Sequence, residues 1–300
     1  MPPSEPLLVW TDALTELVGF IASFFAAGAI GFRFAVLRPF TAPRADADER
    51  QLAGRLAARV AWLGVIGAWV TAGFVVLELR DVATEKHLAI VALVQSMPDV
   101  QVQVTCVILA AVGFVLATRG SNIGWLMAGI GVVAAPFRGL ITGDIFDLVK
   151  SVHALAGGLW VGTLFCLAVF AIPAVLRSRL SSERRGAAVA TLVRAFSPLA
   201  LVAVPVLIGC GVITAWRNLH GWEHLWSTPY GYALLAKLAL VAAVAGFGAW
   251  NWRRQLPRLG SESTARDVWR SARAEVSIAG LVLLVTAILV SLPSPEPPGR

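Results

Sequence analysis

Eight apolar stretches, most of them about 20 residues long, limit what this chain can fold into more than any other feature. A stretch of that length crosses a bilayer as a helix, which satisfies its own backbone hydrogen bonds. Of the 300 residues, 57% are hydrophobic and only 14% are charged, whereas soluble domains carry about 25% charged residues. The sequence therefore predicts an all-α polytopic membrane protein with eight transmembrane helices. We expect these at residues 14–36, 60–77, 100–117, 123–141, 146–176, 187–216, 230–250 and 276–292.

Basic residues in the loops predict the orientation of the chain. The first, third, fifth and seventh loops carry 16 arginines, whereas the intervening loops carry four basic residues, Arg80, Lys86, Arg138 and Arg217. Loops rich in arginine and lysine stay on the cytoplasmic side. We therefore expect a multi-pass protein of the bacterial cytoplasmic (inner) membrane with both termini periplasmic. The net charge of +7 then reflects topology and contact with the lipid bilayer, and no nucleic-acid partner is expected.

A short internal repeat indicates how the helices are organised. Ser96 and Pro98 before the third span match Ser227 and Pro229 before the seventh, and "AVLR" closes both the first and the fifth spans. Two four-helix halves in the same orientation, residues 1–142 and 143–300, would explain the repeat. The alternative is chance, because the matched segments are short.

The fifth span begins with a stripe of ionisable residues. Asp144, Asp147, Lys150 and His153 occur at every third position, so they share one side of a helix. With the predicted orientation His153 lies about 13 Å deeper than Asp144. Ionisable groups in a membrane usually face the interior of the bundle, so we expect this of the stripe. We also expect Lys237 of the seventh span to neutralise a carboxylate, and Asp144 and Asp147 to form an electronegative mouth that attracts cations.

The histidines and two of the cysteines are candidate metal ligands on the outer side. Imidazole with carboxylate suits Cu(II) or Zn(II), whereas cysteine and methionine suit Cu(I). The other interpretations are polar surface for the loop histidines, small apolar packing for the cysteines, and ion pairs within the stripe for its charged groups. The candidate ligands are His87, Cys106, His153, Cys210, His220 and His224.

Several motifs of the C-terminal half resemble the CopD family, the copper resistance protein D membrane proteins. They are "VHALAGGLWVGTLF" (152–165), "AFSPLALVAVPVLIGCGVITAW" (195–216), "STPYGYALLAKLAL" (227–240), "NWRRQLPRL" (251–259) and "SARAEVSIAGLVLLVTAILVSLPSPEPP" (271–298). The resemblance implies eight membrane helices, copper movement across the bacterial inner membrane, and work with a periplasmic copper carrier, CopC. The residues of this chain that match the family's motifs are His153, Tyr230, Gly231 and Lys237. The N-terminal half matches weakly, since the third span lacks the Tyr-Gly pair.

These observations lead to three hypotheses of function. The first is copper ion transport in copper uptake or resistance, with copper as the bound ion. Because no ATP-hydrolysing motif is present, such transport would be passive or ion-coupled, and no enzyme activity is expected. The second is a structural or assembly subunit of a membrane complex built on a CopD-like fold. The third, a haem- or quinone-binding redox protein, is less favoured, because only His153 lies well inside a span and bis-histidine haem ligation needs two.

The predicted topology can be tested with reporters fused after Arg300. Alkaline phosphatase, which is active only outside the cytoplasm, should be active there, and a cytoplasmic fluorescent reporter should be dark. An active cytoplasmic reporter would reverse the orientation of all eight spans.

Overall fold

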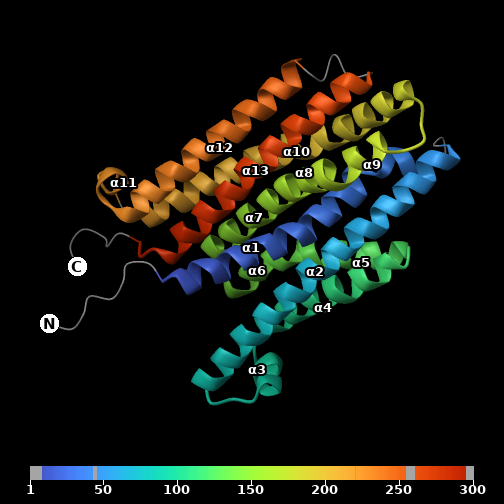
Figure 1. Cartoon of the computed structure of the whole chain (residues 1–300). Helices are drawn as coiled ribbons and strands as arrows, with labels where there is room; N and C mark the ends of the chain where they lie inside the picture. Colours follow the sequence, from blue (N-terminus) through green and yellow to red (C-terminus); the bar gives the residue numbers. More distant parts are fainter. Residues whose placement is uncertain (1–8, 43–45, 220, 255–260, 295–300) are drawn as a thin grey trace.

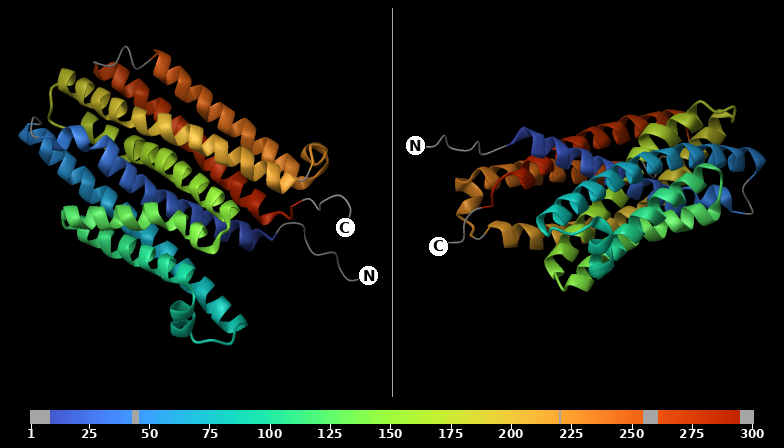
Figure 2. Two further views of the ribbon diagram at one scale, coloured as in Figure 1. Left: turned by 180° about the vertical axis from the view of Figure 1, so that it is seen from behind. Right: turned by 90° about the horizontal axis from the view of Figure 1, so that it is seen from below.

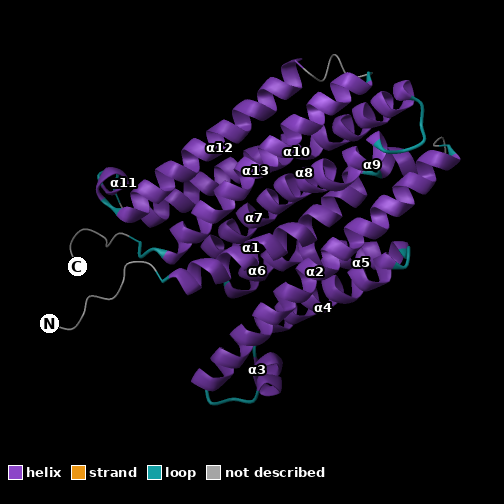
Figure 3. Ribbon diagram, in the orientation of Figure 1, coloured by secondary structure: helices purple, strands orange, loops and turns teal. Residues whose placement is uncertain are grey.

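The computed structural model describes residues 9–42, 46–219, 221–254 and 261–294, and in this part of the chain all regular structure is helical (Figure 3). Eight helical segments are long and apolar enough to cross a membrane. The chain is therefore an all-α polytopic membrane protein, as the sequence predicts. Each predicted span falls within one of the eight segments or ends within one residue of it.

Several spans are built from more than one helical piece. The first comprises α1 (Trp10–Gly31) and a π-helical turn, η1 (Phe32–Val36), and is followed by a 3-10 turn, η2 (Arg38–Thr41). The second span is α2 (Ala47–Glu85) and the third is α4 (Pro98–Thr118). The fourth combines α5 (Asn122–Ala134), η3 (Ala135–Phe137) and α6 (Arg138–Thr142). The fifth comprises α7 (Ile145–Gly157), η4 (Gly158–Gly162), α8 (Thr163–Cys166), η5 (Leu167–Ala171) and α9 (Ile172–Leu176). The last three are α10 (Ser182–Leu219), α12 (Pro229–Arg254) and α13 (Glu262–Ser291), and short helices α3 (Ile90–Ser96) and α11 (His224–Ser227) lie between spans.

The first and fifth spans form the centre of the bundle. Helices α2, α4 and α5 lie on one side of them, and α10, α12 and α13 lie on the other (Figures 1 and 2). The start of α1 and the end of α13 lie at the same end of the bundle, together with α3 and α11 (Figure 1). We call this the outer end, following the predicted orientation, and the opposite end the inner end. The division into halves at residues 142 and 143 stays a prediction.

Two helices extend well beyond their predicted apolar spans. Helix α2 begins after a capping box in which Asp46 accepts from the backbone of Glu49 and the Glu49 side chain reaches back to Asp46. Helix α13 begins after Ser261, whose hydroxyl accepts from the backbone N–H of Thr264. Hydropathy marks only the part of a helix that lies in the bilayer, whereas capping side chains determine where the helix starts.

Glycines allow the two central spans to approach very closely. A Cβ atom on Gly162 would lie 2.2 Å from the carbonyl oxygen of Phe24, and one on Gly28 would lie 2.3 Å from the carbonyl carbon of Gly162. The buried hydroxyl of Thr163 donates to the Gly28 carbonyl at 3.4 Å. Such contacts between small residues are the usual basis of helix association in lipid.

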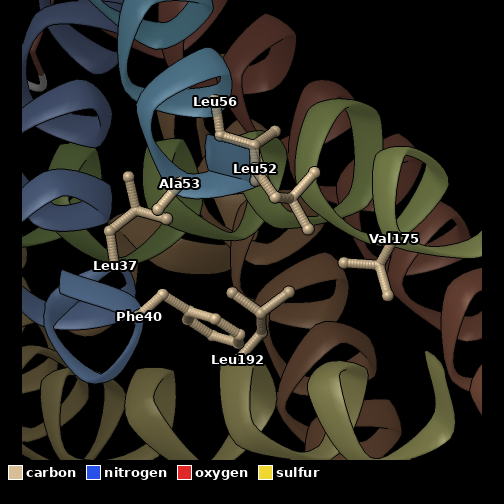
Figure 4. Close-up of a pocket in the computed structure, with 7 residues that line it drawn as sticks. All are labelled: Leu37, Phe40, Leu52, Ala53, Leu56, Val175 and Leu192. Carbon is tan, nitrogen blue, oxygen red and sulfur yellow. The ribbon is translucent and has the colours of Figure 1, made fainter. Parts of the chain in front are cut away.

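At the inner end, apolar side chains close the bundle. Leu37 and Phe40 from the turn after the first span meet Leu56 of α2, Val175 of α9 and Leu192 of α10 (Figure 4). The small hollow between them is wholly apolar and leaves no room for water. This packing joins the end of the first span and the start of α2 to α9 and α10, which come much later in the sequence.

We expect Gly162→Ala to destabilise the protein by about 1–3 kcal/mol, because the added methyl group meets backbone that cannot move aside. The matched control is Gly209→Ala on α10, where nothing lies within 4 Å of the new Cβ. Thermal unfolding in detergent should show a lower Tm for Gly162→Ala and an unchanged or higher Tm for Gly209→Ala. Equal behaviour of the two variants would contradict the close approach of the central spans.

Candidate functional site

The fifth span begins at a tight turn capped by Asp144. Gly143 has a positive φ of 73°, which reverses the chain between α6 and α7. The Asp144 carboxylate then accepts hydrogen bonds from the backbone N–H groups of Phe146 (2.9 Å) and Asp147 (3.0 Å). The pKa of Asp144 is lowered chiefly by the hydrogen bond from Asp147, and also by the bond from Phe146 and the charges of Lys150 and Arg217.

The outer part of the stripe does not face the core of the bundle. Asp144 and Lys150 are exposed, and only Asp147 and His153 are partly buried. The Lys150 ammonium lies 4.6 Å from the centre of the Phe146 ring, one turn earlier on the same helix. An ammonium group and an aromatic ring attract each other in this geometry. Lys150 therefore lies beside the entrance and does not turn inward.

The expectation of an electronegative mouth is wrong. Arg138 approaches Asp147 at 3.8 Å, and the Arg217 guanidinium of α10 lies 4.5 Å from the Phe146 ring. The two carboxylates are therefore accompanied by three cations, Arg138, Lys150 and Arg217. The spacing along one helix could not reveal this, because Arg138 and Arg217 reach the mouth from α6 and α10.

The expected ion pair of Lys237 is also not found. Within the described part of the chain, Asp147 pairs with Arg138, Asp144 caps α7, and Lys237 makes no ion pair. Lys237 instead lies on α12 within electrostatic range of His153. The turn that holds Asp144 at the helix start keeps its carboxylate at the surface, whereas Lys237 is partly buried.

His153 makes the most specific contact of the stripe. Its Nδ1 lies 2.9 Å from the carbonyl oxygen of Leu207 on α10. Because a carbonyl oxygen can only accept, Nδ1 must carry a proton, and in the neutral form of the ring the lone pair is then on Nε2. The orientation of the imidazole is therefore set by a second helix, α10.

Gly211 makes this contact possible. It lies one turn after Leu207 on α10, and a Cβ there would come within 3.1 Å of Cε1 of His153. A larger residue would cover the carbonyl that the imidazole reaches. A glycine four residues after the accepting carbonyl is the sequence signal that the analysis of the spans missed.

Of the other predicted ligands that the structure describes, only Cys210 lies on a helix that contacts His153. Cys210 lies beside Gly211 on α10 and is partly buried, but Cys106 is buried in α4 on the other side of the bundle. His87, with a positive φ of 52°, is exposed beyond α2. His220 lies outside the described residues. Among the residues that the structure describes, no three His, Cys, Asp or Glu side chains are placed to hold a metal ion together.

His224 and the "STPYG" segment build the entry to α12. Nδ1 of His224 lies 2.9 Å from the Leu219 carbonyl. Thr228 donates to the His224 carbonyl at 2.6 Å and accepts from the Gly231 N–H at 3.0 Å. A Cβ on Gly231 would lie 2.3 Å from the His224 carbonyl oxygen. Thr228 and Gly231 thus fix the turn that brings α12, with Lys237, beside α10.

Helices α10, α12 and α13 lie largely in a segment that is similar to a known protein family. Residues 190–289 match the family model of CopD, copper resistance protein D. The predicted resemblance is confirmed for the motifs within this segment, and the motif at residues 152–165 lies outside it. The matched segment contains most of α10, all of α12 and most of α13, and so includes the Leu207 carbonyl, Gly211 and Lys237.

A curated relative is the copper transport protein CutJ of Bacillus subtilis (strain 168), which is 30% identical over 151 residues. The aligned part is 50% of this chain and 26% of CutJ, so the chain spans about a quarter of that relative's length. No solved structure matches the chain.

The cap at the start of α7 should be sensitive to acid. Because the folded pKa of Asp144 lies below its unfolded value, its stabilising effect is complete above the ordinary carboxyl pKa of about 3.9 and is lost as the pH falls through the lower folded value. Hydrogen-exchange protection of the Phe146 and Asp147 amides, corrected for the intrinsic exchange rate, should therefore fall at acid pH. Asp144→Asn, which keeps a capping oxygen but does not titrate, should remove this pH dependence. Equal acid sensitivity in Asp144→Asn would show that another group controls the first turn.

Proposed function

We propose that this protein transports copper ions across the bacterial cytoplasmic membrane and that His153 binds the ion on its way. The observation that carries the proposal is the His153–Leu207 contact, which joins the fifth span to the segment matched by the CopD model. The 30% identity to a copper transport protein supports the same class of cargo. A periplasmic CopC-like carrier is the proposed partner at the outer end.

The chemistry of His153 suits a copper ligand. Nδ1–H donates to a backbone carbonyl, so Nε2 of the neutral imidazole is available to a metal ion, and this arrangement is typical of metal-binding histidines. Copper accepts imidazole and thiolate ligands, and thiolate favours Cu(I). Cys210, next to Gly211 on the same helix, is the proposed second ligand.

The cation near His153 favours passage of the ion over storage. Lys237 is within electrostatic range of the imidazole, and a nearby positive charge disfavours a second one. It therefore weakens the binding of a metal cation at this position. A transport site must bind its ion strongly enough to admit it and weakly enough to release it.

Copper enters this site because of its ligands and not because of an acidic entrance. The mouth carries three cations beside its two carboxylates, so long-range attraction for a free cation is small. Transfer from a carrier protein that docks at the outer end avoids this barrier, since the ion then moves between ligands without being free in water.

The alternative function is that of a structural or assembly subunit in a membrane complex. The observation that favours it is the exposure of the matched helices: only 6% of the most apolar window of the sixth span and 11% of that of the seventh are buried within the chain. Gentle solubilisation followed by mass spectrometry tests it. Stoichiometric co-purification of other membrane subunits, with no copper bound to the complex, would favour this alternative over transport.

We expect His153→Ala to lose copper that the purified wild-type protein binds, while its abundance in the membrane stays unchanged. His224→Ala is the matched control, because its Nδ1 also meets a backbone carbonyl but the residue lies between the spans. Gly211→Val should displace the imidazole from Leu207 and weaken copper binding roughly 10–100-fold, as loss of an orienting contact does. Metal analysis and competition titration with a copper chelator provide the measurements. Copper binding by His153→Ala equal to that of the wild type would refute the assignment.

A further inference from the structure

The inner end of the first span contains a π turn that changes which residues share a side. In η1, from Phe32 to Val36, the backbone N–H of Leu37 donates to the carbonyl of Phe32 at 3.0 Å, five residues earlier. π turns are rare and frequently occur at functional sites. The copper site proposed above lies on other helices.

The π turn places two arginines beside one hollow. In a regular α-helix, residues five apart such as Arg33 and Arg38 would point about 140° apart. The wider turn reduces this difference. Both side chains now line the same open hollow of about 330 Å³, together with Phe34 and Thr41.

Arg33 is held in position by the neighbouring span. Its Nη2 donates to Oδ1 of Asn122 at 3.0 Å, and its guanidinium carbon lies 6.0 Å from the ring centres of Phe34 and Trp125. These contacts leave its charge uncompensated. Among the described residues neither Arg33 nor Arg38 makes an ion pair, and no acidic side chain lines the hollow.

The chemistry of the hollow fits a phosphate group. Guanidinium groups bind phosphate oxygens through paired, charge-assisted hydrogen bonds. We propose that Arg33 and Arg38 bind the headgroup phosphate of an anionic phospholipid in the inner leaflet. The position at the end of a membrane span favours a lipid over free phosphate, and Phe34, which is 42% exposed, offers an apolar surface for the acyl chain.

The test uses the full-length protein in neutral detergent, titrated with phosphatidylglycerol or phosphatidylcholine and followed by native mass spectrometry. The wild type should bind phosphatidylglycerol more tightly than phosphatidylcholine. Arg38→Gln, at an exposed position where folding is not at risk, and Arg33→Gln should each weaken phosphatidylglycerol binding about fivefold, the effect of one basic residue at a membrane surface. Arg33→Lys, which keeps the charge, should retain most of the preference.

Arg177→Gln is the matched control. Arg177 closes the fifth span with the same "AVLR" sequence that ends in Arg38, is also exposed, and does not line the hollow. Equal binding of the two lipids by the wild type, or equal losses in Arg38→Gln and Arg177→Gln, would overturn the site. Inorganic phosphate that displaces phosphatidylglycerol completely at millimolar concentration would assign the hollow to free phosphate and overturn the lipid.

Discussion

The glycine-mediated approach of the first and fifth spans is the contact on which the rest of the bundle depends. Gly28 and Gly162 allow backbone to meet backbone, and the buried Thr163 hydroxyl bonds across the interface. In lipid there is no hydrophobic driving force between helices, so such close packing supplies much of the association energy. The two outer groups of helices then pack on opposite sides of this central pair (Figure 1).

This central pair also fixes the position of His153. The imidazole precedes Gly157 and Gly158, where the fifth span packs on Phe24 and Ala27 of α1. On its other side it reaches the Leu207 carbonyl of α10. A side chain held from both sides is oriented in advance, and in the proposed copper site this would lower the entropic cost of binding. In the proposed transport, the nearby Lys237 would weaken the binding of the metal ion and so favour its release.

The sequence predicted the spans well because hydropathy reflects the bilayer directly. It predicted helix ends less well, since α2 and α13 continue into polar capping sequences at Asp46 and Ser261. It identified His153 as an ionisable residue in a span but not its partner, because a backbone carbonyl has no side-chain signature. The pairing of Lys237 with the stripe was wrong because spacing along one helix cannot reveal that Arg138 and Arg217 reach the same carboxylates and ring from neighbouring helices. Charge at a helix mouth is a property of the assembled bundle.

The central claim is that Nε2 of His153 binds copper inside the membrane. X-ray absorption spectroscopy on the copper-loaded protein tests it most directly, because outer-shell scattering from an imidazole ring identifies a histidine ligand for either oxidation state of copper. The account predicts imidazole scattering in the wild type and in His224→Ala, and its loss, with a change of coordination, in His153→Ala. The same imidazole signal in His153→Ala as in the wild type would contradict the account.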